Sequence, residues 1–197
     1  METCADALAR LCDPNTEVSA HYLISGTGQI WRMVEEYQRA WHAGSGRWGD
    51  VTDVNSHSIG IELSNTGLTP FAEPLMTALE AMLTGIMARW RIPPERVIAH
   101  SDMAPSRKQD PGPRFDWRRL ALGDLSVWPE AGQGCDATFM DHATAFGYSA
   151  EEDPEDVLKA FRWRFRPWHD GPPDRTDTAL AADLARRFPI DRTAATA

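Results

Sequence analysis

The feature that most constrains the fold is a long amphipathic segment in the middle of the chain. Between positions 70 and 90, apolar residues recur at steps of three and four, the spacing of one helix face. These residues are Leu75, Leu79, Met82, Leu83, Ile86 and Trp90. Strand-like stretches precede the segment at 19–25, 30–34 and 57–65, and "GTGQ" between the first two indicates a hairpin. The patterns therefore predict three strands, two of them paired as a hairpin, followed by a long helix.

Shorter patterns complete the first 122 residues. A helix is expected at 4–11, a short buried strand at 97–99 that delivers His100 at its C-terminal end, and a helical turn at 115–122. In the third strand, side chains alternate between two faces. Ile61 lies on the apolar face of this strand and Glu62 lies on the other face, where we expect its carboxylate.

A second, helical module is expected at the C-terminus. Residues 123–134 mix Gly, Pro and Ser without a clear period and are interpreted as a linker. The segments 154–166 and 174–188 each place apolar residues on one helix face, and Asp174 is the expected N-cap of the second. Two or three short helices around an aromatic core would make a compact module.

Charge and hydropathy exclude several classes of partner. The chain carries 29 acidic and 20 basic residues, a formal net charge of −9, which argues against nucleic acid because phosphate binding needs a basic face. No apolar stretch reaches the ~18 residues of a membrane-spanning helix. We expect a monomer without a membrane span.

The stretch "HSDMAPSRKQDPGP" at 100–113 suggests a metal-assisted hydrolase. Such an enzyme needs metal ligands, a base for the attacking water and a cation for the oxyanion. His100 and Asp110 are candidate ligands, Lys108 is the candidate cation and Glu62 the candidate base.

Each of these residues also has an ordinary structural interpretation. His100 can be a hydrogen-bonded core histidine, and Asp110 before a proline can simply start a turn. Lys108 and Glu62 can be solvated charges, and His42 can be a loop histidine stacked on the neighbouring tryptophan. The residues alone support no more than a metal-assisted hydrolase.

Four motifs occur in the same order as in a known enzyme family. "VSAHYLI", "RAWHAG", "SIGIEL" and "HSDMAPSRKQDPGPRFDW" resemble the zinc-dependent N-acetylmuramoyl-L-alanine amidases of type 2, over residues 5–121. The resemblance implies an α/β fold, a central mixed β-sheet flanked by helices. It implies Zn²⁺ on His100 and Asp110, catalysis by Glu62 and transition-state stabilisation by Lys108. We further expect Trp41 and His42 to line the substrate groove.

The C-terminal segment resembles the three-helix peptidoglycan-binding domains. The resemblance rests on "VLKAFRWRFRPWHDGPPDRTDTALAADL". It implies an amidase domain at 1–122, a linker at 123–134 and a peptidoglycan-binding-like domain at 135–190. The expected reaction is cleavage between N-acetylmuramic acid and L-alanine in peptidoglycan or muropeptides. The module would keep the enzyme close to its insoluble substrate.

One element of the family pattern has no counterpart here. The family takes a further zinc histidine from a strand that precedes the helix expected at 4–11, and no residue of this chain matches it. We therefore expect the first strand to be absent from the sheet. Two explanations are open: the chain starts downstream of its natural beginning, which we favour, or the protein lacks the strand. In the second case it would be a catalytically impaired protein that still binds peptidoglycan but lacks a complete zinc site. Both a cytoplasmic and an envelope location stay open.

Overall fold

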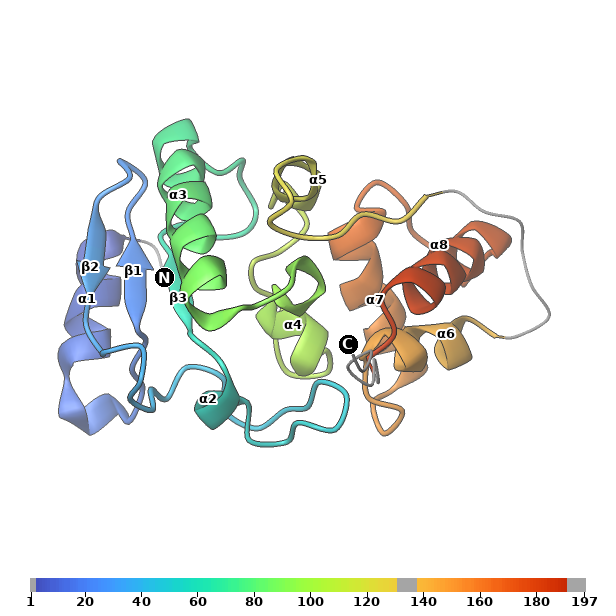
Figure 1. Cartoon of the computed structure of the whole chain (residues 1–197), viewed down its shortest axis with the longest axis horizontal. Coiled ribbons are helices and arrows are strands. Elements are labelled where there is room, and N and C mark those ends of the chain that lie inside the picture. Colours follow the sequence, from blue (N-terminus) through green and yellow to red (C-terminus); the bar gives the residue numbers. More distant parts are fainter. Residues whose placement is uncertain (1–2, 131–137, 191–197) are drawn as a thin grey trace.

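The computed structural model describes residues 3–130 and 138–190. A small mixed sheet lies in its N-terminal half (Figure 1). The sheet contains β1 (Tyr22–Ile24), β2 (Ile30–Arg32) and β3 (Ile61–Leu63) in the order β2-β1-β3. β1 and β2 form the expected antiparallel hairpin, and β3 runs parallel to β1. The expected α/β class with a mixed sheet flanked by helices is confirmed. In the described part of the chain, no further strand pairs with the outer edge of β3.

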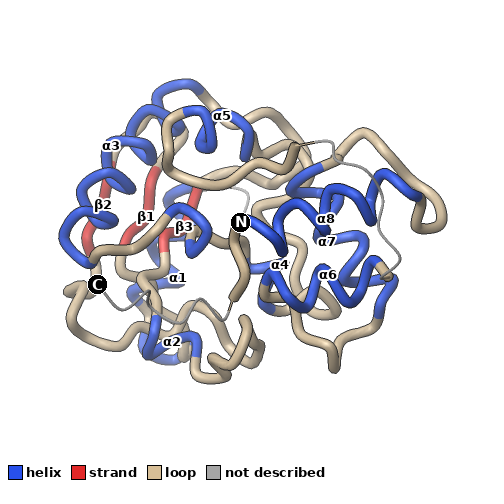
Figure 2. Tube along the Cα trace, turned by 45° about the vertical axis from the view of Figure 1, so that its right-hand side comes forward, coloured by secondary structure: helices blue, strands red, loops and turns tan. Residues whose placement is uncertain are grey.

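Two helices cover opposite faces of the sheet. Leu23 of β1 packs in one cluster with Ala7 and Leu11 of α1 (Cys4–Cys12). Its neighbour Ile24 points the other way and packs against α3 (Glu73–Trp90), which lies beside the strands in Figure 2. The alternation of side chains along β1 therefore places the sheet between α1 and α3.

The helix expected at 70–90 is α3, and its apolar stripe is the buried one. Leu75, Leu79, Leu83 and Ile86 are buried. The helix starts three residues later than expected, with Pro74 in the first turn, where a missing N–H is tolerated. Trp90 is 47% exposed rather than buried, and its indole Nε1 donates a hydrogen bond to Glu36.

The carboxylate of Glu36 ties the chain after the hairpin to the end of α3. It accepts hydrogen bonds from Tyr22, Arg89 and Trp90. The hydrogen bond from Arg89 is the main reason that the pKa of Glu36 falls to about 2. A carboxyl with a lowered pKa in the folded state stabilises the fold above its unfolded value of 4.5, and loses this contribution as the pH falls towards 2.

We expect Glu36→Gln to lower the free energy of unfolding by about 1–3 kcal/mol at pH 7. The difference from the unsubstituted protein should shrink steadily between pH 4.5 and pH 2, because both then carry a neutral group at this position. Urea unfolding at several pH values measures this difference. A constant difference over that range would contradict the assignment.

The prediction of a strand at 97–99 is wrong. These residues are extended but unpaired, and the chain turns at once into the short helix α4 (His100–Met103). Side chains, rather than a neighbouring strand, bind two of their backbone groups. Arg164 donates to the carbonyl of Val97, and Asp102 accepts from the N–H of Ala99. His100 is therefore the first residue of a helix rather than the end of a strand.

Short elements connect the larger ones. They are η1 (Pro14–Thr16), α2 (Val54–His57), η2 (Pro94–Arg96) and α5 (Trp117–Leu122). The helix expected at 4–11 and the helical turn expected at 115–122 are confirmed as α1 and α5.

Three helices form the C-terminal part: α6 (Phe139–Phe146), α7 (Pro154–Phe165) and α8 (Arg175–Arg187). The expected N-cap Asp174 is confirmed, since its side chain accepts the N–H groups of Thr176 and Asp177. The small helical module is thus present, with α6 as its third helix.

The apolar core of this module does not stop at its border. One buried cluster joins Phe146, Phe161 and Leu184 to Trp48 and Met103 of the N-terminal half. In the stretch expected to be a linker, residues 125–127 are buried. The domain limits 1–122, 123–134 and 135–190 stay a prediction, and part of the linker lies outside the described residues.

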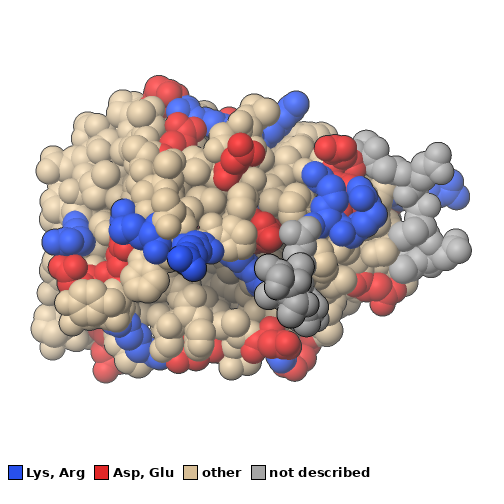
Figure 3. All heavy atoms as spheres, viewed as in Figure 1, with Lys and Arg blue, Asp and Glu red and all other residues tan. Residues whose placement is uncertain are grey.

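Acidic and basic side chains are interspersed over the face shown in Figure 3. Among the described helices, none combines the length and the hydropathy that a membrane crossing requires.

Candidate functional site

The run 100–113 folds back on itself and brings two candidate ligands together. Nδ1 of His100, at the start of α4, lies 2.9 Å from Oδ2 of Asp110. The N–H of Ser101 donates to the Asp110 carbonyl at 3.0 Å, which closes the loop between the two residues. A ring nitrogen and a carboxylate oxygen at this separation can share one divalent cation.

The other ring nitrogen of His100 is held by a backbone carbonyl. Nε2 lies 2.8 Å from the carbonyl oxygen of Ala43. Because a carbonyl can only accept, Nε2 donates this hydrogen bond, and Nδ1 is the ring nitrogen that faces Asp110. Histidine ligands of metals are commonly oriented by such a hydrogen bond to a backbone carbonyl. The pair therefore fits zinc chemically.

Glu62 supplies a second carboxyl at the site. It lies at the centre of β3, opposite Leu23 in the register, so it occupies the face away from α3. Burial raises the pKa of Glu62, and the charge of Asp110 raises it further, whereas His100 and Lys108 act in the opposite direction. A carboxyl with a raised pKa is suited to accept and return a proton near neutral pH.

Lys108 belongs to the same group of charges. Its backbone N–H donates to the carbonyl of Ala104 at 2.9 Å, directly after α4, and its ammonium charge acts on Glu62. Glu62 of β3 thus lies within electrostatic range of three charged groups of the run 100–113, those of His100, Lys108 and Asp110.

His42 and Trp41 differ from each other in their surroundings, because the His42 ring is largely buried and the Trp41 ring is exposed. The ring of His42 covers Gly60, where an added Cβ would lie only 2.2 Å from its Cγ, and it packs edge-on to His21. Burial is the main cause that lowers the pKa of His42 to about 4, so the ring is neutral. Trp41 is 56% exposed, with the guanidinium of Arg39 4.3 Å above its ring. A substrate role for either residue stays a prediction.

Two supporting residues escaped the sequence reasoning. Asn55 Oδ1 accepts the N–H groups of His42 and Ala43, and Arg107 Nη2 donates to the Ala43 carbonyl at 2.7 Å. Arg107 thus binds the carbonyl that orients His100, and Asn55 binds the N–H of the same residue, Ala43. Arg107 lies inside the conspicuous run and could have been suspected, whereas nothing local distinguishes Asn55.

The Pro-Gly-Pro end of the run meets the loop after β3. Gly112 has φ +86°, and a Cβ there would lie 2.8 Å from the carbonyl oxygen of Gly67. Glycine is needed because both the dihedral angle and the close backbone approach exclude a side chain. A cavity of about 220 Å³ lies beside this contact and is lined by residues 66–68 and 109–113, including Asp110.

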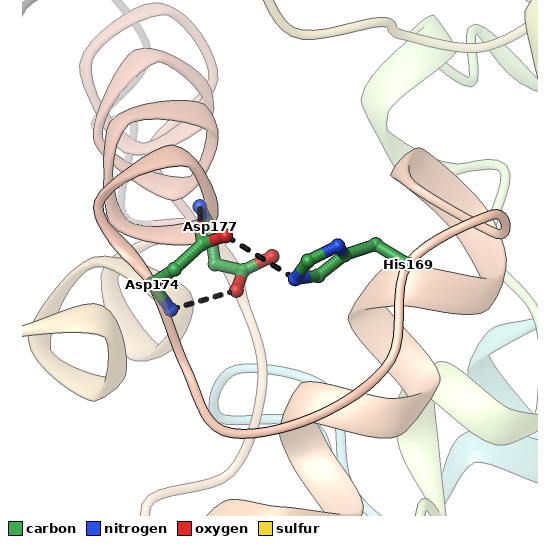
Figure 4. Close-up of side chains that lie close together, drawn as sticks. All are labelled: His169, Asp174 and Asp177. Carbon is green, nitrogen blue, oxygen red and sulfur yellow. Dashed lines mark hydrogen bonds and ion pairs between the residues drawn. The ribbon is translucent and has the colours of Figure 1, made fainter.

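A second cluster of ligand-type side chains lies away from this site. Donor atoms of His169, Asp174 and Asp177 all lie within 4.8 Å of one another (Figure 4). Arg162 pairs with Asp177 at 2.5 Å, and Arg166 pairs with Asp174 at 2.7 Å. The two arginines already neutralise the carboxylates, and Asp174 caps α8. We interpret the cluster as an ion-pair network rather than a metal site.

Zinc fits the site of His100 and Asp110 only in part. His100 and Asp110 offer one nitrogen and one oxygen, whereas a catalytic zinc usually has three protein ligands. In the described part of the chain, no third His, Cys, Asp or Glu donor joins this pair within the distance that defines the cluster above.

The sequence matches the family described as N-acetylmuramoyl-L-alanine amidase (Amidase_2) over residues 1–113. The N-acetylmuramoyl-L-alanine amidase AmiD of Escherichia coli K12 is 35% identical over 220 residues, 94% of this chain and 79% of AmiD. The 1,6-anhydro-N-acetylmuramyl-L-alanine amidase AmpD of the same strain is 38% identical over 105 residues, 53% of this chain and 57% of AmpD.

Solved structures agree with the sequence matches. The structure of E. coli AmiD in complex with the substrate anhydro-N-acetylmuramic acid-L-Ala-D-gamma-Glu-L-Lys superimposes with a TM-score of 0.86 at 33% identity, covering 94% of this chain and 85% of that chain. AmpDh3 of Pseudomonas aeruginosa superimposes with a TM-score of 0.85 at 27% identity, over 94% of this chain and 88% of AmpDh3. The described fold, the run 100–113 and these matches together establish that the chain belongs to the N-acetylmuramoyl-L-alanine amidase (Amidase_2) family.

Proposed function

We propose that the protein hydrolyses the amide bond between N-acetylmuramic acid and L-alanine in peptidoglycan or muropeptides, with zinc as cofactor. The observation that carries the proposal is the pairing of His100 Nδ1 with Asp110 Oδ2 within range of the charges of Glu62 and Lys108. The complex of AmiD with a muropeptide substrate supports this choice of bond, because AmiD resembles the chain along almost its whole length.

The residues of the chain divide the chemistry between them. His100 and Asp110 would hold the zinc, with the third position of the ligand set still to be assigned. When bound, zinc supplies a Lewis acid that polarises the carbonyl and acidifies water. Glu62 takes the proton of the attacking water and returns it to the nitrogen of the leaving L-alanine. Lys108 donates a hydrogen bond to the oxyanion that develops on the carbonyl oxygen.

The C-terminal helices are proposed to contact the polymer as a peptidoglycan-binding module. A cavity of about 610 Å³ has Pro113, the last residue of the run 100–113, on one side. Its other side is formed by α7 and the segment 167–173. Lys159 and Trp163 of α7 line it, and the ammonium of Lys159 lies 5.0 Å from the centre of the Trp163 ring. An aromatic ring and a cation are suitable partners for a sugar and for a carboxylate of a stem peptide. Trp41 and His42 are proposed to line the opposite part of the substrate groove.

The alternative is a protein that binds peptidoglycan without cleaving it. It rests on the finding that two ligand side chains, rather than three, meet at the site within residues 3–130 and 138–190. A third ligand from elsewhere would complete the site, and its lack would leave zinc weakly held.

Metal analysis and product analysis together test the proposal. Purified protein, dialysed against a zinc buffer, should retain about one zinc per chain and release stem peptide from anhydro-muropeptides, as followed by mass spectrometry. A strong chelator should stop the release, and added zinc should restore it. Retention on cell-wall sacculi without zinc and without release would favour the binding protein.

A further inference from the structure

A buried carboxylate two residues after His100 joins the site to the C-terminal helices. Asp102 has no exposed surface. Its Oδ2 accepts a hydrogen bond from Nη1 of Arg164 at 2.6 Å, and its Oδ1 accepts one from the hydroxyl of Tyr148 at 2.6 Å. Arg164 lies on α7 and Tyr148 lies two residues after the end of α6, so both partners belong to the helical module.

Arg164 holds the segment that carries His100 at both ends. While Nη1 binds Asp102, Nη2 donates to the carbonyl of Val97 at 2.8 Å. Asp102 Oδ2 also accepts the N–H of Ala99 at 2.8 Å, which closes the segment on itself. His100 lies between these anchored points, so its backbone is held on both sides.

The surroundings keep the two partners of Asp102 in their donor states. Arg164 is 1% exposed, and its guanidinium carbon lies 4.5 Å from the ring centre of Trp117 and 4.9 Å from that of Phe165. Burial, and next the charge of Asp102, raises the pKa of Tyr148 well above its ordinary value, so the hydroxyl stays protonated. Asp102 thus receives hydrogen bonds from a permanent cation and a neutral phenol.

Stability alone is a weak explanation for this arrangement. A buried ion pair costs desolvation, and well-packed apolar side chains of similar volume often stabilise a core as well or better. Apolar contacts, however, do not fix the direction of a backbone segment as three directional hydrogen bonds do. His100 needs that direction, since both of its ring nitrogens meet partners at hydrogen-bond distance, Ala43 and Asp110.

We propose that Arg164 and Tyr148 are positioning residues, which act through Asp102 to orient His100 at the metal site. The C-terminal module is then part of the site's support as well as a contact for the polymer. The inference rests on the zinc site of the proposed function, so its test includes a measurement that is independent of zinc.

Arg164→Lys keeps the positive charge but loses the guanidinium, which binds both Asp102 and the carbonyl of Val97. We expect this variant to melt cooperatively and to bind zinc 10–100-fold more weakly in competition with a chromophoric chelator, the usual cost of losing a partner behind a ligand. Tyr148→Phe removes a single hydrogen bond and should weaken zinc binding severalfold. One-bond ¹H–¹⁵N spectra of the imidazole groups of the zinc-free protein give the second readout. The Nε2 proton of His100 should give a resolved signal in the unsubstituted protein, and this signal should be absent from the spectrum of Arg164→Lys.

Arg162 provides a matched control. It lies on α7 two residues earlier, is 6% exposed, and pairs at 2.5 Å with the buried Asp177 of α8, inside the module. Arg162→Lys should cost similar stability but leave zinc affinity and the His100 signal unchanged.

The inference is overturned if Arg164→Lys binds zinc as tightly as the unsubstituted protein, or if Arg162→Lys weakens zinc binding equally. If the unsubstituted protein takes up no zinc, the proposed function fails, and the His100 signal alone decides the positioning role.

Discussion

Glu62→Gln should reduce stem-peptide release from anhydro-muropeptides by about 10²–10⁴-fold, the usual contribution of a general base. The amide of glutamine has nearly the shape of the carboxyl group but cannot take a proton from water. Because the pKa of Glu62 is raised mainly by burial, the carboxyl is well matched to a proton that must be taken up and returned in one turnover. Initial rates under single-turnover conditions measure the loss at the chemical step.

Zinc content and a surface control separate this effect from a loss of structure. Glu62 is assigned no role as a metal ligand, so Glu62→Gln should hold as much zinc as the unsubstituted protein. Glu35, a half-exposed carboxylate paired with Arg32 at 3.3 Å, is the control, and Glu35→Gln should leave the rate unchanged. Undiminished release by Glu62→Gln would remove the carboxyl from the mechanism.

Phe161→Ala should lower the free energy of unfolding by about 3–5 kcal/mol, the cost of a large cavity in a packed core. Phe161 has no exposed surface, and its ring centre lies 5.1 Å from that of Phe139 and 5.0 Å from that of Phe165. A loss of this size is a large share of the 5–15 kcal/mol that stabilises a typical domain. Denaturant unfolding measures it directly.

The same variant tests whether the two halves share one core. Phe161 belongs to the buried cluster that includes Met103 of α4 and Trp48, so the N-terminal half should unfold in the same transition. Trp168→Ala removes an aromatic ring of the same module that is 74% exposed, and it should change stability by no more than about 0.5 kcal/mol. Two separate transitions in Phe161→Ala, with the second unchanged, would instead support independent domains.

Local patterns in the sequence determined much of the fold. The apolar stripe of α3, the hairpin of β1 and β2 and the Asp174 cap all depend on residues a few positions apart, where spacing alone reports which side chains meet. The run 100–113 is readable for the same reason, since His100 and Asp110 meet across a short loop.

The tertiary structure decided what the sequence could not. Whether residues 97–99 form a strand depends on a partner strand, and the described structure instead binds the Val97 carbonyl to Arg164 and the Ala99 N–H to Asp102. No spacing rule links Asp102 to an arginine 62 positions away, because a charged side chain is ordinarily exposed and is buried only where the fold supplies a partner. The sequence thus determined which residues are proposed to bind the metal and to move the proton, whereas only the packing of the C-terminal helices against α4 decided how His100 is held in place.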